Sequence, residues 1–218
     1  MTDSDDLRVR RRLLLRATLR HVPFDGWTAV AMKAGAADLG LDMAQALLLV
    51  PGGMGELAEL FHAEADRRML EDLALHDLTA LKVRERIALA VRLRLEPWSG
   101  DREAIRRLLG FLAQPQEAPR AARLLYRTVD AIWHGVGDRS TDFAFYTKRA
   151  LLAGVVSATA LYWLEDKSEG SADSWAFLDR RIADVLKIPQ QMARARKALD
   201  RLPDPLRLLK HLRGGRAA

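Results

Sequence analysis

The chain has 218 residues, of which 49% are hydrophobic, and this is enough to bury one sizeable core. It contains no cysteine, which excludes disulfides and thiolate metal sites and is compatible with a reducing compartment. The net charge of +6 is uneven, because residues 187–216 carry nine basic side chains against two acidic ones. This basic end indicates either an anionic partner, lipid or nucleic acid, or a solvated end of the chain.

Nearly every segment has apolar residues at helical spacing, so the sequence predicts an all-α fold of about ten helices. The expected helices span residues 7–21, 28–39, 42–49, 54–75, 79–95, 101–112, 118–136, 143–165, 172–186, 189–202 and 206–212. Residues 1–6 are polar and acidic, with neither an apolar segment nor an amphipathic presequence, so no targeting signal is expected.

The first three helices have the lengths and turns of a tetracycline-repressor-type helix-turn-helix, with residues 13–26 as its opening helix and 29–49 as its reader pair. The reader helix from Asp42 to Val50 offers Gln45 as its only plausible base-reading side chain and contains no Lys or Arg. Because attraction to phosphates supplies essentially all non-specific affinity for DNA, this helix is predicted to keep the shape of a reader without its contacts.

Catalytic and metal motifs are weak or absent. Glu59 and His62 have the Glu-x-x-His spacing of di-iron bundles, but no second such motif occurs, so His62 is expected to be a surface or a satisfied histidine. The sequence has no phosphate-binding glycine loop and no nucleophile elbow. We therefore predict a protein that is not an enzyme and has no cofactor or metal.

Residues 137–149 are polar with aromatics and cations, and they lead into fifteen uncharged residues, 150–164. A span of the bilayer needs roughly 20 apolar residues, so a buried core helix is expected instead.

On a helix that starts near Ser140, four residues at three- and four-residue spacing share one face: Asp142, Phe145, Tyr146 and Arg149. This composition is typical of interface hot spots, although a core-edge aromatic stripe with a solvated ion pair would have the same pattern. The same helix contains four small residues: Ala153, Gly154, Ala158 and Ala160. They would allow either close packing of a neighbouring helix or room for a ligand, and the sequence does not decide between these.

Near the C-terminus, five leucines follow helical spacing with basic residues beside them. The leucines are Leu199, Leu202, Leu206, Leu209 and Leu212, and the basic residues are Arg207, Lys210 and Arg213. Leucines opposite cations are typical of a helix that lies in a membrane interface. The alternative is a terminal helix that docks on its own domain or on a dimer partner.

Three blocks of sequence carry a family resemblance: residues 21–28 (HVPFDGWT), residues 140–153 (STDFAFYTKRALLA), and residues 162–168 (YWLEDKS) together with 175–181 (WAFLDRR). They resemble the ubiquinone (coenzyme Q) biosynthesis accessory lipid-binding family, Coq-nine, in its alphaproteobacterial form. The resemblance covers about residues 7–200. It implies a tetracycline-repressor-like homodimer that has lost DNA binding, in one continuous domain with a degenerate helix-turn-helix region (1–50), a lipid-binding and dimerisation region (51–188) and a basic amphipathic tail (189–218).

The resemblance also implies a function. The protein would hold an isoprenoid quinone intermediate or a phospholipid in an apolar pocket and present it to a ubiquinone-pathway hydroxylase. It would be cytoplasmic and peripheral to the inner membrane, which the tail would contact. The docking patch for the hydroxylase would be Asp142, Phe145, Tyr146 and Arg149. The family usually has Trp where this chain has Phe145, and the change removes contact area and an indole donor.

Helical periodicity then suggests the walls of the implied pocket. These are Trp133, Leu151, Leu152, Val155 and Leu161, with Arg149 able to meet a headgroup or phosphate. The rival function is a ligand-sensing transcription regulator of the tetracycline-repressor type, against which the apolar reader helix argues.

Overall fold

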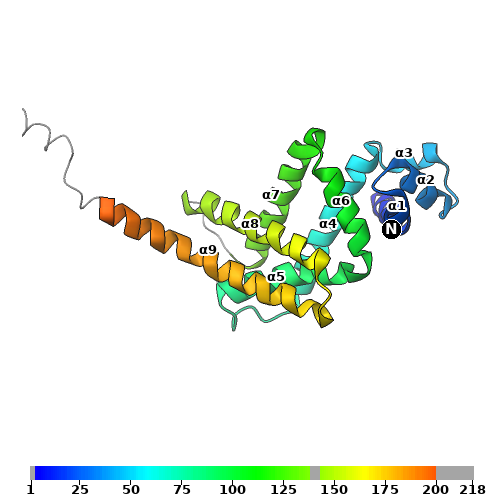
Figure 1. The fold of residues 1–218 in the computed structure, drawn as a ribbon. Helices are drawn as coiled ribbons and strands as arrows, with labels where there is room; N and C mark the ends of the chain where they lie inside the picture. The colour runs from blue at the N-terminus through cyan, green and yellow to red at the C-terminus, as the bar shows by residue number, and fades with distance from the viewer. Residues whose placement is uncertain (1–2, 138–142, 200–218) are drawn as a thin grey trace, which may run out of the picture.

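The computed structural model describes residues 3–137 and 143–199, of which residues 3–4, 143–146, 186 and 188–199 are described by their backbone alone. Within these ranges the chain forms nine α-helices and three short 3-10 helices and no strand, which confirms the all-α prediction (Figure 1). The α-helices are α1 (Asp3–Asp25), α2 (Ala29–Ala37), α3 (Met43–Leu49), α4 (Gly53–Ala74), α5 (Val83–Leu95), α6 (Arg102–Leu112), α7 (Ala118–Gly135), α8 (Phe143–Glu165) and α9 (Ala172–Leu199). The 3-10 helices are Glu96–Asp101, Pro115–Glu117 and Glu169–Ser171.

Helices α1 to α3 form a unit at one end of the molecule (Figure 1). Helix α1 continues through Pro23 and ends before Gly26, whose φ of +71° suits glycine. Helices α1 and α2 cross closely at Gly35, where an added Cβ would lie 2.5 Å from the Thr18 backbone nitrogen. A glycine is therefore required for this crossing.

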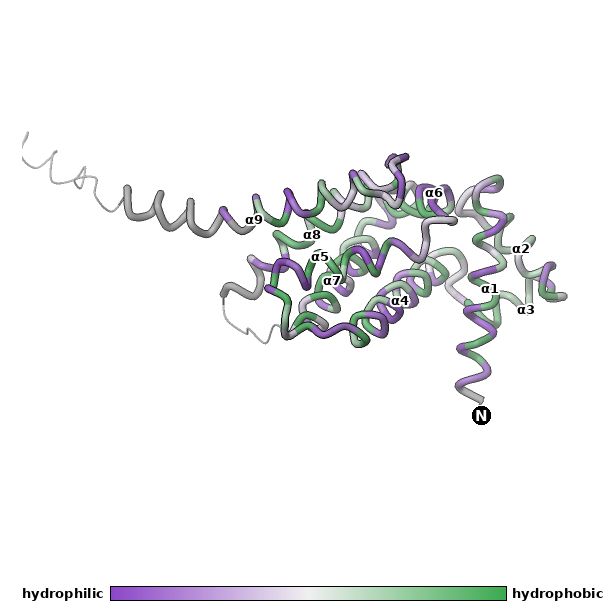
Figure 2. The backbone as a smooth tube through the Cα atoms, turned by 90° about the horizontal axis from the view of Figure 1, so that it is seen from below, coloured by the Kyte–Doolittle hydropathy of each residue, from purple (hydrophilic) through white to green (hydrophobic). Residues whose placement is uncertain are grey.

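Helices α4 to α8 pack into a bundle beside this unit, and one hydrophobic core runs through both. Helix α4 buries Leu57, Phe61, Ala65 and Met69, whereas Leu60 is only half-buried. Helix α9 packs against α5 and α8 and then extends past the bundle, at the end away from α1 to α3 (Figure 1). Along the first turns of α1, hydrophilic and hydrophobic residues alternate (Figure 2).

Several expected boundaries change, and the first helix, expected over residues 7–21, spans Asp3–Asp25. Two helices were predicted for residues 172–186 and 189–202, but α9 continues through Pro189, because a proline removes one helical hydrogen bond without having to end the helix. The helix predicted from residue 79 begins at Val83. Thr28 precedes α2, but its hydroxyl donates to the Asp25 carbonyl instead of capping the helix. The helix predicted for residues 206–212 lies outside the described residues.

None of the described helices combines the length and the hydrophobicity needed to cross a membrane.

Candidate functional site

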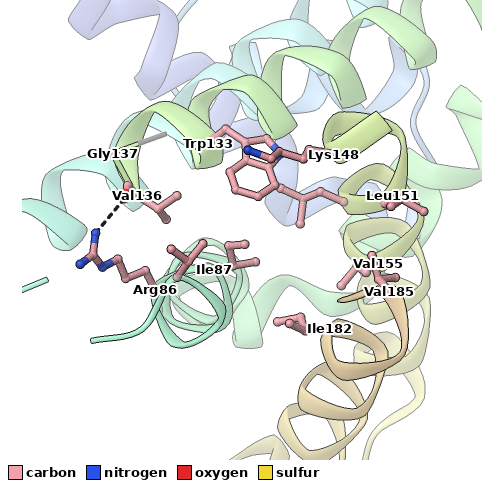
Figure 3. Close-up of a pocket in the computed structure, with 12 residues that line it drawn as sticks. Arg86, Ile87, Trp133, Val136, Gly137, Lys148, Leu151, Val155, Ile182 and Val185 are labelled. Carbon is pink, nitrogen blue, oxygen red and sulfur yellow. Dashed lines mark hydrogen bonds between the residues drawn. The ribbon is translucent and has the colours of Figure 1, made fainter. Parts of the chain in front are cut away.

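An apolar cavity of about 350 Å³ lies among α5, α7, α8 and α9, and we call it the α9 cavity (Figure 3). Its lining is mostly aliphatic, with one indole and two cationic side chains. The lining residues are Val83, Arg86, Ile87, Trp133, Val136, Gly137, Lys148, Leu151, Leu152, Val155, Ile182 and Val185. Its volume falls within the usual range of small-molecule sites, about 300–1,000 Å³.

Helix α8 supplies the longest wall of the α9 cavity. Val155 lies four residues after Leu151 and three after Leu152, so it shares a face with each of them, and together they form one broad wall. Leu152 and Val155 are buried and belong to the core, while Leu151 is half-buried. The wall is therefore continuous with the packed core.

The polar groups of the α9 cavity lie near the end of α7 and the start of α8. The Lys148 ammonium lies 5.7 Å from the centre of the Trp133 ring (Figure 3). Arg86 donates from Nη1 to the Val136 carbonyl at 3.2 Å and from Nε to the Leu81 carbonyl at 2.9 Å. Gly137 ends this turn with a φ of +86°. The cavity thus has cations at one end and hydrocarbon along its length.

Trp133 also brings a hydrogen-bond donor to the α9 cavity. Its ring is buried, and its indole Nε1 has no hydrogen-bond partner among the described residues. Because buried N–H groups are nearly always paired, this donor marks a place where a bound molecule could supply an acceptor.

The structure brings four of the six predicted lipid-binding residues together in this cavity: Trp133, Leu151, Leu152 and Val155. Arg149 and Leu161 lie elsewhere. Arg149 is buried and donates from Nε and Nη2 to Asp130 Oδ1 at 3.0 and 2.7 Å, so it joins α8 to α7. Leu161 lies near the far end of α8 and is 59% exposed.

The predicted docking patch and membrane tail fall mostly outside what the structure describes. Asp142 is outside it, and Phe145 and Tyr146 lie in the first turn of α8 but are described by backbone alone. The same holds for Leu199 at the end of α9. The remaining tail residues lie beyond the described chain: Leu202, Leu206, Arg207, Leu209, Lys210, Leu212 and Arg213.

Sequence reasoning missed the two cations, Arg86 and Lys148, and the walls from α5 and α9. Lys148 lies next to Arg149 in the chain, so a signal existed, but adjacent helix residues face about 100° apart and periodicity alone did not choose between them. For Arg86, Ile87 and Ile182 no local signal was available, because they reach the cavity only through helix packing.

Glu59 and His62 do not form a pair. Glu59 accepts from Arg120 at 3.0 Å, and His62 Nδ1 lies 3.0 Å from Arg94 Nη2.

In the reader helix α3, the Gln45 side-chain oxygen accepts from the Asp42 backbone N–H, and the Gln45 N–H donates to the Asp42 carboxylate. The one base-reading candidate is thus engaged in a capping box.

The sequence model of the COQ9 family matches residues 118–189, which include α7, α8 and the start of α9 and so three of the four walls of the α9 cavity. Ubiquinone biosynthesis protein COQ9, mitochondrial, of Rattus norvegicus is 37% identical over 189 residues, which are 80% of this chain and 58% of that protein. The corresponding Homo sapiens protein is 35% identical and covers 80% of this chain and 57% of its own. The chain spans less than two thirds of the length of these two relatives.

The Xenopus laevis protein COQ9-B is 33% identical over 200 residues, which cover 87% of this chain and 68% of that relative. Among solved structures, a TetR transcriptional regulator from Nitrosomonas europaea superposes with a TM-score of 0.68 at 21% identity and covers 81% of this chain and 98% of its own. This likeness confirms the tetracycline-repressor-like fold. The family is shown by the Xenopus laevis relative, and the family model and the rat and human relatives agree with it: the chain belongs to the COQ9 family.

Proposed function

We propose that this chain is an accessory protein of ubiquinone biosynthesis that holds an isoprenoid quinone intermediate or a phospholipid in the α9 cavity and presents it to a partner hydroxylase at the membrane. The α9 cavity carries the proposal, because it is apolar, preformed and built largely from the helices that match the family. The ubiquinone pathway is inferred from the rat and human relatives, which are ubiquinone biosynthesis proteins.

The energetics favour a cavity of this kind. A polyprenyl intermediate that leaves the bilayer exposes apolar surface at a cost of roughly 25 cal/mol per Å². Apolar walls such as Leu152, Val155 and Ile182 offset this cost for the part of the molecule that they enclose. At about 350 Å³ the cavity has room for a ring or headgroup with a few carbons of its chain, so the rest of a long isoprenoid would remain in the membrane or along α9.

The polar end of the cavity fits an oxygen-bearing head. Lys148 and Arg86 supply cationic donors, and the Trp133 indole N–H supplies a neutral one. Phosphate and quinone oxygens are both acceptors of such donors. The head would therefore lie near the turn from α7 to α8, with the chain directed between α8 and α9.

Presentation would follow from the position of this end. The first turn of α8, which contains Phe145 and Tyr146, immediately precedes Lys148 at the cavity. A hydroxylase docked on Asp142, Phe145 and Tyr146 would meet the head of the bound molecule there. The basic tail from residue 189 would hold the protein at the membrane surface, and two such chains would associate as a homodimer.

Native mass spectrometry with lipid extraction tests lipid binding directly. We expect the purified chain to retain about one lipid or quinone precursor per subunit. Leu152→Trp should fill the α9 cavity and remove most of this lipid. Ala150→Trp on the same helix is the matched control, because Ala150 is exposed and lies outside this cavity. An empty wild-type protein, or equal lipid loss in both variants, contradicts the proposal.

Co-purification with the hydroxylase tests docking separately. Tyr146→Ala should reduce hydroxylase recovery and leave the lipid content and the helical circular dichroism unchanged. Normal recovery would show that the docking residues are assigned wrongly. The alternative, a transcription regulator, has only the fold in its favour, because α3 contains no basic residue to bind DNA phosphates. A gel shift with genomic duplexes at physiological salt tests whether the chain binds DNA.

A further inference from the structure

A second apolar cavity, of about 330 Å³, lies further along α7 and α8 and shares no lining residue with the α9 cavity. We call it the α6 cavity, because α6 forms one wall opposite α4, α5, α7 and α8. Its largest side chains include Phe61, Trp98, Leu108, Leu125 and Leu161. The rings of Phe61 and Trp98 pack together with centres 4.6 Å apart.

One edge of the α6 cavity is polar and centred on Arg94, whose side chain is only 9% exposed. Its Nε donates to Asp66 Oδ1 at 2.7 Å, and its Nη2 donates to the Thr128 hydroxyl at 3.1 Å. Thr128 in turn donates to Asp66 at 3.0 Å. The guanidinium charge is therefore compensated by Asp66 within the cluster.

Arg94 also determines the tautomer of His62, which lines the same cavity. Arg94 Nη2 lies 3.0 Å from His62 Nδ1, and a guanidinium can only donate, so Nδ1 must be the acceptor. Burial, followed by the charges of Arg94 and Arg127, lowers the pKa of His62 to about 3, so the ring is neutral near pH 7. The single ring proton is consequently on Nε2.

That proton has no partner. His62 Nε2 is buried and makes no hydrogen bond within the described chain, and the same is true of the Trp98 indole Nε1. Both residues line the α6 cavity. A buried N–H that finds no acceptor is rare and destabilising, and two beside one cavity indicate that something else provides the acceptor.

We propose that the α6 cavity is a separate binding site for an uncharged, mainly apolar molecule that presents a carbonyl oxygen to His62 Nε2–H. The carbonyl is favoured over a carboxylate or phosphate because Arg94, the one charged side chain in the described lining, is already paired with Asp66, and His62 is uncharged. The site does not depend on lipid binding in the α9 cavity, so either assignment can fail alone.

Prodan, an uncharged naphthyl ketone whose emission reports its surroundings, is the probe. We expect saturable binding to the full chain, with blue-shifted emission and a lowered infrared carbonyl stretch in carbon-thirteen-labelled probe. His62→Asn keeps an acceptor for Arg94 but loses the donor at the Nε2 position, and it should weaken binding about tenfold. His62→Gln, whose amide reaches that position, should restore most of the affinity and the carbonyl shift.

Two cavity-filling variants on α8 locate the probe. Ala160→Phe narrows the α6 cavity and should abolish Prodan binding, whereas Leu151→Trp narrows the α9 cavity and should leave it unchanged. Thermal unfolding confirms that each variant is folded. The proposal is overturned by absent or non-saturable binding, by equal affinity in wild type and His62→Asn, or by loss of binding in Leu151→Trp with retention in Ala160→Phe.

Discussion

The two cavities have similar volumes, about 350 and 330 Å³, and both use α7 and α8, yet their charges differ. The described lining of the α9 cavity contains Arg86 and Lys148 and no acidic residue. In the described lining of the α6 cavity the one arginine, Arg94, is paired with Asp66 and donates a hydrogen bond to the neutral ring of His62. Two cavities of similar volume therefore suit different ligands, because the pairing of Arg94 with Asp66 leaves the charged side chain of the α6 cavity already occupied.

The largest expected effect comes from removing the two arginines in turn. Arg94→Met leaves the largely buried Asp66 without its cationic partner and should lower the free energy of unfolding by about 3–5 kcal/mol. Arg86→Met loses two bonds to backbone carbonyls and should lower it by about 1–2 kcal/mol. Urea unfolding of both variants measures the difference, and equal losses would refute the contrast between the cavities.

A second test uses pH. Because the folded-state pKa of His62, about 3, lies below its ordinary value of 6.5, the stability that depends on the neutral ring is complete above 6.5 and is lost as the pH falls towards 3. Arg94 and Arg127 act on the ring, Asp66 is paired with Arg94, and all three remain in both proteins compared in this test.

His62→Gln has no ring to protonate, so its stability should fall less than that of wild type between about pH 7 and pH 4. Urea midpoints at the two pH values measure this, and parallel losses in the two proteins would show that His62 is not kept neutral by the fold.

A smaller effect is expected at the turn beside the α9 cavity. Gly137→Ala forces a Cβ into a backbone with φ of +86° and should cost about 1 kcal/mol, although the nearest atom, Arg86 Nη1, is 4.0 Å from that Cβ. Gly154→Ala on α8 has open space around it and should be neutral or stabilise the helix by up to about 1 kcal/mol. Thermal unfolding separates them, and a neutral Gly137→Ala would mean that the turn is not constrained.

The smallest expected effect concerns ligand charge. Lys148→Gln removes one cation from the α9 cavity and should reduce retention of an anionic phospholipid about fivefold relative to a zwitterionic one, as expected for about 1 kcal/mol per cation. Prodan binding in the α6 cavity should not change. Native mass spectrometry with mixed lipids measures the ratio, and an unchanged ratio would show that Lys148 does not select charge.

Much of the fold could be predicted because helical periodicity is local. The helix predicted for residues 143–165 coincides with α8, and the boundaries of α3 and α6 differ from the prediction by one residue. The depleted reader helix was also visible in the sequence. The continuation of α9 through Pro189 was not, since whether a proline kinks or ends a helix depends on what packs against it.

The sequence alone determined the all-α class, the apolar wall of Leu151, Leu152 and Val155, and the family, since each rests on residues close together in the chain. Only the tertiary structure decided that Lys148 and not Arg149 lines the α9 cavity, and that Arg86 and Ile182 complete it. It also placed His62, which looked like an ordinary histidine, against Arg94 from another helix. The physical reason is that cavities and buried charge pairs form between helices distant in sequence, where packing fixes which face of each helix turns inward.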